Sequence, residues 1–204
     1  MRGPGPAPPG FRHREIPEAA IHSKRWPIFL LFFASGFAGL TLEVVWARHL
    51  SLLTGSGVRA SAAVVALTIA GLALGSRHAA KRADRSSRPL AAYALLEGMI
   101  AIWALATPWL FRVLPRLVLA LPAGRDPAAA DLGPGTLAAT ALLLLPGTFL
   151  MGATTPFLVR HGSLHWPRPG THPAGNRSAG SLLGSLYGWN TLGGAAGSLA
   201  TVFA

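Results

Sequence analysis

The stretch that decides the fold is residues 35–48, SGFAGLTLEVVWAR, inside the first long apolar run of the chain, residues 26–47. A helix needs about 20 apolar residues to cross a hydrocarbon core of about 30 Å, and this run is long enough. The stretch also carries a carboxylate, Glu43. A charge inside such a helix costs on the order of 2.5–3.5 kcal/mol at the bilayer centre. We therefore expect a membrane protein in which Glu43 faces other helices, water or a cation instead of lipid.

The composition of the whole chain agrees with this expectation. Of its 204 residues 51% are hydrophobic and 12% are charged, whereas soluble domains carry about 25% charged residues. The net charge is +11. Because the basic residues lie between apolar runs, they predict membrane topology and contact with the lipid bilayer, and they argue against nucleic-acid binding. The chain has no cysteine, which excludes disulfides, thiolate chemistry and cysteine-based metal sites.

The chain divides into a polar tail and an apolar body. Residues 1–25 are rich in proline and glycine and then charged, which predicts a disordered basic tail. Residues 26–204 are predicted to form one all-α domain, a polytopic transmembrane helix bundle. Its five expected spans cover about 26–47, 60–76, 89–111, 135–159 and 181–204. The first run begins late and is too long for a cleavable signal peptide.

The connections between these spans have distinct compositions. The first, residues 51–59, holds the turn sequence Thr54-Gly55-Ser56. The second, residues 77–88, is strongly basic. Residues 113–131 are broken by prolines and are expected to form an interfacial segment, and residues 160–179 form a loop rich in Pro, Gly and His.

Small residues recur at spacings of four in two of the spans. The second span contains Gly71 and Gly75, and the last contains Gly180, Gly184 and Gly188, followed by Gly193 and Gly197. Glycines at this spacing allow two helix backbones to approach closely in lipid. They predict close packing within the bundle, and they would also allow a homo-oligomer to form.

The distribution of lysine and arginine indicates an orientation. Thirteen of the 18 lie in the tail and in the connections 77–88 and 160–179. The positive-inside rule then places the N-terminus in the cytoplasm, and we expect the protein to lie in a plasma membrane. The last apolar run reaches Ala204 without a flanking charge, and we expect the chain to be a fragment of a longer protein.

Two acids lie inside predicted spans, Glu43 and Glu97. If the first and third spans are neighbours, the two carboxylates could share a proton or bind a cation, as in membrane carriers. The alternative is a structural role, in which each is neutralised by a proton or by an arginine such as Arg48. Arg48 is a further candidate for substrate binding, as are Tyr187 and Asn190, the polar members of the last span. A lone asparagine there also suits an interhelical hydrogen bond.

No reaction chemistry is recognisable in the sequence. His161, His165 and His172 are irregularly spaced and have no acid nearby, so no metal site is predicted. There is no Gly-rich phosphate loop after a strand and no Ser/His/Asp order. We predict no catalytic residue and no cofactor for this chain.

Six short motifs together resemble one family. They are 39–48 GLTLEVVWAR, 71–76 GLALGS, 83–85 ADR, 93–97 YALLE, 150–156 LMGATTP and 186–193 LYGWNTLG. In this order they resemble the membrane-embedded N-terminal region of bacterial fused proteins that join major-facilitator-like helices to a spermidine-synthase-like domain. Asp84 and Arg85 resemble the cytoplasmic loop motif of major facilitators. The sequence departs from the pattern at Leu42, at Ala80 and at Gly188-Trp189.

The resemblance implies a truncated major-facilitator-like half in the bacterial inner membrane and an aminopropyltransferase domain downstream. Any enzymatic activity would belong to that domain. We expect this chain to be the membrane module, with Glu43 and Glu97 binding a polyamine or another cationic small molecule. The alternatives are a fragment of a small-solute or cation transporter and a purely structural membrane anchor.

Overall fold

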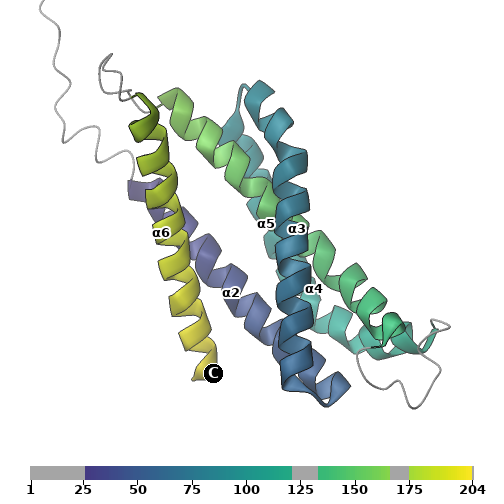
Figure 1. Cartoon of the computed structure of the whole chain (residues 1–204). Coiled ribbons are helices and arrows are strands. Elements are labelled where there is room, and N and C mark those ends of the chain that lie inside the picture. Colours follow the sequence, from purple (N-terminus) through teal and green to yellow (C-terminus); the bar gives the residue numbers. More distant parts are fainter. Residues whose placement is uncertain (1–25, 121–132, 166–174, 204) are drawn as a thin grey trace, which may run out of the picture.

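The structure is a computed structural model that describes residues 26–120, 133–165 and 175–203 as a bundle of five α-helices (Figure 1). The helices are α2 Trp26–Thr54, α3 Gly57–Arg85, α4 Pro89–Ala120, α5 Pro134–His165 and α6 Gly175–Val202. These three ranges contain no strand, so the predicted all-α bundle is confirmed. The predicted basic tail, residues 1–25, lies outside the described residues.

Four of the helices, α2 to α5, are long and apolar enough to cross a membrane. At 1.5 Å per residue the 29 residues of α3 reach about 44 Å, which exceeds a hydrocarbon core of about 30 Å. The helix at the predicted fifth span, α6, does not meet this criterion over the residues that the structure describes. Its many glycines, which lie between 184 and 197 in this part, contribute little apolar surface.

Two helix pairs run parallel and in close contact, and the first is α3 with α5. An added Cβ atom at Gly71 would collide with the Thr148 side chain, and one at Gly75 would collide with the Phe149 carbonyl. From the opposite side, Gly152 leaves room for the backbone of Leu72. The predicted close packing at Gly71 and Gly75 therefore occurs, and its partner is α5.

The second parallel pair is α2 with α6, which lie side by side in Figure 1. Gly193 and Gly197 rest on the backbone carbonyls of Phe33 and Phe37. Trp189 adds an aromatic contact, since its ring centroid lies 5.2 Å from that of Trp26 in an edge-on arrangement. By contrast, Gly184 and Gly188 have open space where a Cβ atom would be.

Two apolar clusters close the bundle at its two ends. The larger one joins Trp46 and Leu50 of α2 to buried side chains of α3, α4 and α5. The smaller one contains Phe32 of α2, Leu158 of α5 and Leu186 of α6. Along both α2 and α5, a middle section lies between these clusters.

Most helices are longer than the apolar runs predicted. The basic segment 77–88 was expected to be a loop, but α3 continues through Arg85 and only residues 86–88 connect it to α4. The physical reason is that helical hydrogen bonds do not require apolar side chains, so a helix continues past the membrane core into polar sequence. The predicted turn at Gly55 is confirmed, and its φ of 68° is one that glycine adopts readily.

The prediction for residues 113–131 is wrong in its first part, because α4 continues to Ala120 and contains Pro108 and Pro115. A proline inside a helix costs about 3 kcal/mol. Leu114 is 1% exposed and Phe111 is also buried, both in the larger cluster. Burial of such side chains contributes about 1.5–3 kcal/mol each, which offsets the cost of Pro115. Residues 121–132 lie outside the described part.

The glycine contacts predict a stability difference. Gly75→Ala should lower the thermal unfolding midpoint, because the new methyl group meets the Phe149 backbone and overpacking costs about 1–3 kcal/mol. Gly98→Ala is the matched control, since nothing lies within 4 Å of its added Cβ. Alanine favours a helix over glycine, so the control should unfold at the same temperature or higher. Equal midpoints for the two variants in detergent would contradict this packing.

Candidate functional site

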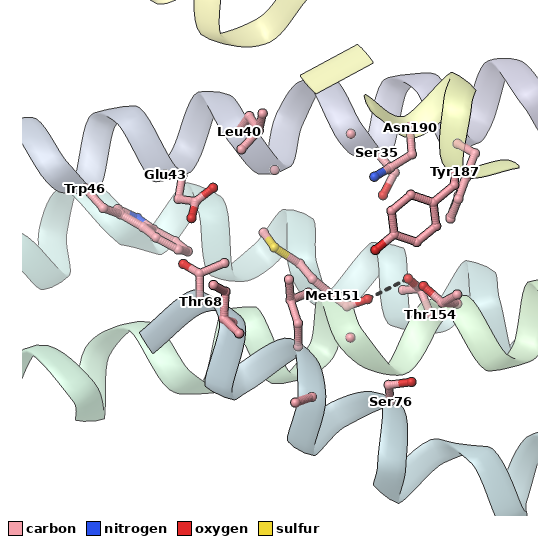
Figure 2. Close-up of a pocket in the computed structure, with 18 residues that line it drawn as sticks. Ser35, Leu40, Glu43, Trp46, Thr68, Ser76, Met151, Thr154, Tyr187 and Asn190 are labelled. Atoms are coloured by element: carbon pink, nitrogen blue, oxygen red, sulfur yellow. Dashed lines mark hydrogen bonds between the residues drawn. The ribbon is translucent and has the colours of Figure 1, made fainter. Parts of the chain in front are cut away.

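A pocket of about 530 Å³ occupies the middle section between the two apolar clusters (Figure 2). Four helices line it, namely α2, α3, α5 and α6. Its polar lining residues are Ser35, Glu43, Trp46, Thr68, Ser76, Thr154, Thr155, Tyr187 and Asn190. The remaining wall is made of apolar side chains and glycines, and no Lys, Arg or His occurs among the described lining residues.

The α2 wall of the pocket is a single stripe along the helix. Ser35, Gly39, Glu43 and Trp46 recur at spacings of three and four residues, which places them on one face. Gly39 has no atom within 4 Å of its Cβ position, so it leaves open space beside the carboxylate. The same face that carries Glu43 therefore carries an opening large enough for a ligand.

Glu43 lies half-buried in this pocket. Figure 2 shows its carboxylate and the Thr68 side chain of α3 pointing toward one another, with the Trp46 indole beside them. The Thr68 hydroxyl makes no hydrogen bond within the described residues. The sequence left open whether Arg48 neutralises this acid. Arg48 is exposed and does not line the pocket.

Glu97 lies behind the α2 wall and does not line the pocket. The Ser35 hydroxyl donates a hydrogen bond of 2.9 Å to Glu97 Oε1, which joins α2 to α4. Tyr93, 3% exposed, lies one helical turn before Glu97 and interacts with both Glu97 and Ser35. The first and third predicted spans are therefore neighbours. The two acids could share a ligand only in such an arrangement.

The two acids nevertheless hold separate positions. Ser35, to which Glu97 is bonded, precedes Glu43 by eight residues, which is about 12 Å along a helix. Glu43 therefore faces the pocket directly, whereas Glu97 reaches it only through the Ser35 hydroxyl.

The two candidates from the last span both lie at the pocket. Tyr187 and Asn190 line it from α6, and Figure 2 shows the Tyr187 ring directed into it. Asn190 also packs against α2, because its carbonyl and Oδ1 lie where a Cβ of Gly36 would be. Asn190 thus combines the two roles that the sequence left open, a contact between helices and a place in the wall.

The remaining predicted residues lie away from the pocket. Asp84 and Arg85 are exposed in the last turn of α3, so they are helical and not part of a loop. The rings of His161 and His165 stack with centroids 4.3 Å apart, and His172 is outside the described residues. Within the described ranges no group of three or more His, Asp or Glu could hold a metal ion.

Sequence reasoning missed four residues of this arrangement: Ser35, Thr68, Tyr93 and, as part of the site, Trp46. Hydroxyl groups inside apolar helices are the only available signal for the first three. Trp46 follows Glu43 by three residues, so helical spacing alone would have placed it on the same face.

The Ser35–Glu97 bond yields a second stability prediction. Ser35→Ala should destabilise the bundle by about 1–3 kcal/mol, because it removes one hydrogen-bond donor from a part-buried carboxylate. Ser163→Ala is the control, since the exposed Ser163 hydroxyl bonds only to the Arg160 carbonyl of its own helix. Chemical denaturation in detergent measures both. Equal losses in the two variants would mean that the α2–α4 bond contributes nothing specific.

Comparison with models of protein families, with curated proteins and with solved structures finds no match to this chain. The function is therefore inferred from the residues of the pocket.

Proposed function

We propose that this chain is an integral membrane module that binds an organic ammonium cation in the pocket, with Glu43 as its counter-charge. One observation carries the proposal: a carboxylate lines a pocket between four helices, three of them long and apolar enough to span a membrane, and no cationic side chain occurs among the described lining residues. A protein that retains such a group must offset its burial with a proton or with a ligand.

The other walls of the pocket suit an organic cation better than a bare metal ion. Phe32, Trp46 and Tyr187 contribute aromatic rings, whose faces attract ammonium groups by about 0.5–2 kcal/mol. Leu40, Leu72 and Met151 give apolar surface for methylene groups. A Ca²⁺ or Mg²⁺ ion would need six or more oxygen ligands around it, and a single carboxylate supplies too few of them.

The resemblance to fused spermidine-synthase-like proteins makes the cation a polyamine. In this form of the proposal the chain is the membrane part of a bacterial inner-membrane protein and brings amines near a catalytic domain encoded downstream. Glu97 supports the same site indirectly, because it accepts the hydrogen bond of Ser35, which lines the pocket.

A second candidate is a fragment of a major-facilitator-type transporter. It is favoured by the position of the pocket, which lies between the glycine-packed pairs α2–α6 and α3–α5 and between the two apolar clusters. Uptake of a labelled amine into proteoliposomes that contain this chain alone would support transport. Binding without uptake would indicate that the chain binds the amine but does not transport it.

Replacement of the pocket carboxylate tests the proposal. Spermidine and simple alkylamines should raise the thermal unfolding midpoint of the parent chain in detergent, because binding to the folded state stabilises it. Glu43→Gln should lose nearly all of this increase, since the amide keeps the shape but not the charge. The measurement is a melting curve at several amine concentrations.

Asp84→Asn is the matched control, because it removes one acid from the exposed end of α3. It should keep the full amine-induced increase. If Glu43→Gln responds to amines as the parent does, Glu43 is not the counter-charge and the proposal fails. The purely structural anchor would then be the better account.

We also propose that the basic end of the bundle faces the cytoplasm. Arg77, Lys81, Arg82, Arg85 and Arg88 lie exposed where α3 ends and α4 begins, and the positive-inside rule favours the cytoplasmic side for them. The opposite end carries the turn at Gly55 and Ser56.

Because the chain has no cysteine, single substitutions report the orientation without background. In intact cells a membrane-impermeant maleimide should label Ser56→Cys, which lies in the α2–α3 turn. Ser87→Cys, between α3 and α4, should react only after the cells are permeabilised. The reverse pattern would contradict the proposed orientation.

A further inference from the structure

Two polar atoms in the pocket wall have no hydrogen-bond partner among the described residues. They are Nε1 of Trp46 and Oγ1 of Thr68, both buried. Trp46 is 1% exposed, so bulk water does not reach its indole in the closed bundle. Buried polar atoms without partners are rare in folded proteins, so each one calls for an explanation, and an absent ligand is one explanation for such an atom in a binding site.

The two atoms differ in what they need. A threonine hydroxyl both donates and accepts, and the Thr68 side chain already points toward Glu43 in Figure 2. An indole N–H can only donate. Trp46 therefore needs a hydrogen-bond acceptor, and none of the described lining residues, Glu43 included, accepts a hydrogen bond from it.

A plain ammonium ligand leaves this need unmet. Its N–H groups are donors, which pair with the Glu43 carboxylate but not with the Trp46 N–H. In Figure 2 the nitrogen of the Trp46 ring lies on the edge nearer to Glu43, so a group bound at Glu43 is next to it. The occupant that satisfies both residues must bring a donor and an acceptor to neighbouring positions.

We infer that the preferred occupant carries a neutral hydrogen-bond acceptor beside its ammonium group, and that this acceptor bonds to Trp46 Nε1–H. The inference rests on the proposed function, because Glu43 must hold the ammonium. The acceptor is neutral because the described lining has no Lys, Arg or His to balance a second, negative group. Suitable classes are amino alcohols, amino amides and polyamines with one nitrogen unprotonated. Zwitterionic amino acids do not suit the site, since Glu43 repels their carboxylate.

A matched pair of ligands tests the inference on the full chain in detergent. N-butylethanolamine and N-butylpropylamine differ only in that a hydroxyl group replaces a methyl group. Calorimetric titration of the parent should give a ratio of dissociation constants that favours the hydroxy amine. In Trp46→Phe the preference for the hydroxy amine, measured by this ratio, should weaken by about fivefold. This corresponds to the loss of one hydrogen bond to a buried donor.

Trp103→Phe is the control for the loss of an indole. Its Nε1 is also buried without a partner among the described residues, but Trp103 does not line the pocket. This variant should keep the parental ratio. If Trp46→Phe keeps it too while both amines still bind and depend on Glu43, the inference is overturned and the proposed function stands. If neither amine binds, the proposed function fails and the inference with it.

A spectroscopic measurement covers the case in which Trp46→Phe does not fold. The chain has six tryptophans, whose indole N–H groups give separate signals after ¹⁵N labelling. One signal of the parent should move downfield with N-butylethanolamine and not with N-butylpropylamine, and it should persist in Trp103→Phe. Identical spectra with the two amines would contradict the inferred hydrogen bond.

Discussion

Backbone approach at glycine is the constraint on which the rest of this structure depends. Lipid provides no hydrophobic force between helices, so packing at short range decides which helices associate. Gly71, Gly75 and Gly152 bring α3 against α5, while Gly193 and Gly197 bring α6 against α2. The pocket lies between these two tight pairs.

The position of Glu43 follows from this arrangement. It lies on the face of α2 that carries Ser35, Gly39 and Trp46. This face is turned toward the pocket between the two pairs. A carboxylate there is removed from lipid yet has no cationic side chain among the described lining residues. Glu97 differs because it accepts a hydrogen bond from the Ser35 hydroxyl of α2 and interacts with Tyr93 of its own helix. The two acids look alike in the sequence, but one faces a pocket and the other links two helices.

Much of the fold could be predicted because apolar runs of membrane length leave few alternatives to helices. The ends of α3 and α4 could not be predicted, since they depend on helical hydrogen bonds beyond the apolar run and on burial of Leu114 next to Pro115. For the site, Glu43, Tyr187 and Asn190 were expected and do line one pocket. The Ser35–Glu97 bond spans 62 residues, and the unpaired Trp46 nitrogen depends on contacts among four helices. Neither has a local signal in the sequence.

We propose above all that an amine binds directly at Glu43. The most direct measurement couples a bound primary amine, hexylamine, to neighbouring carboxylates with a membrane-permeant carbodiimide, and peptide mass spectrometry then locates the amide formed. The account predicts modification of Glu43 that competing spermidine suppresses, with little at Glu97 or at the exposed Asp84. Modification that spares Glu43, or that competing amine does not reduce, would contradict it.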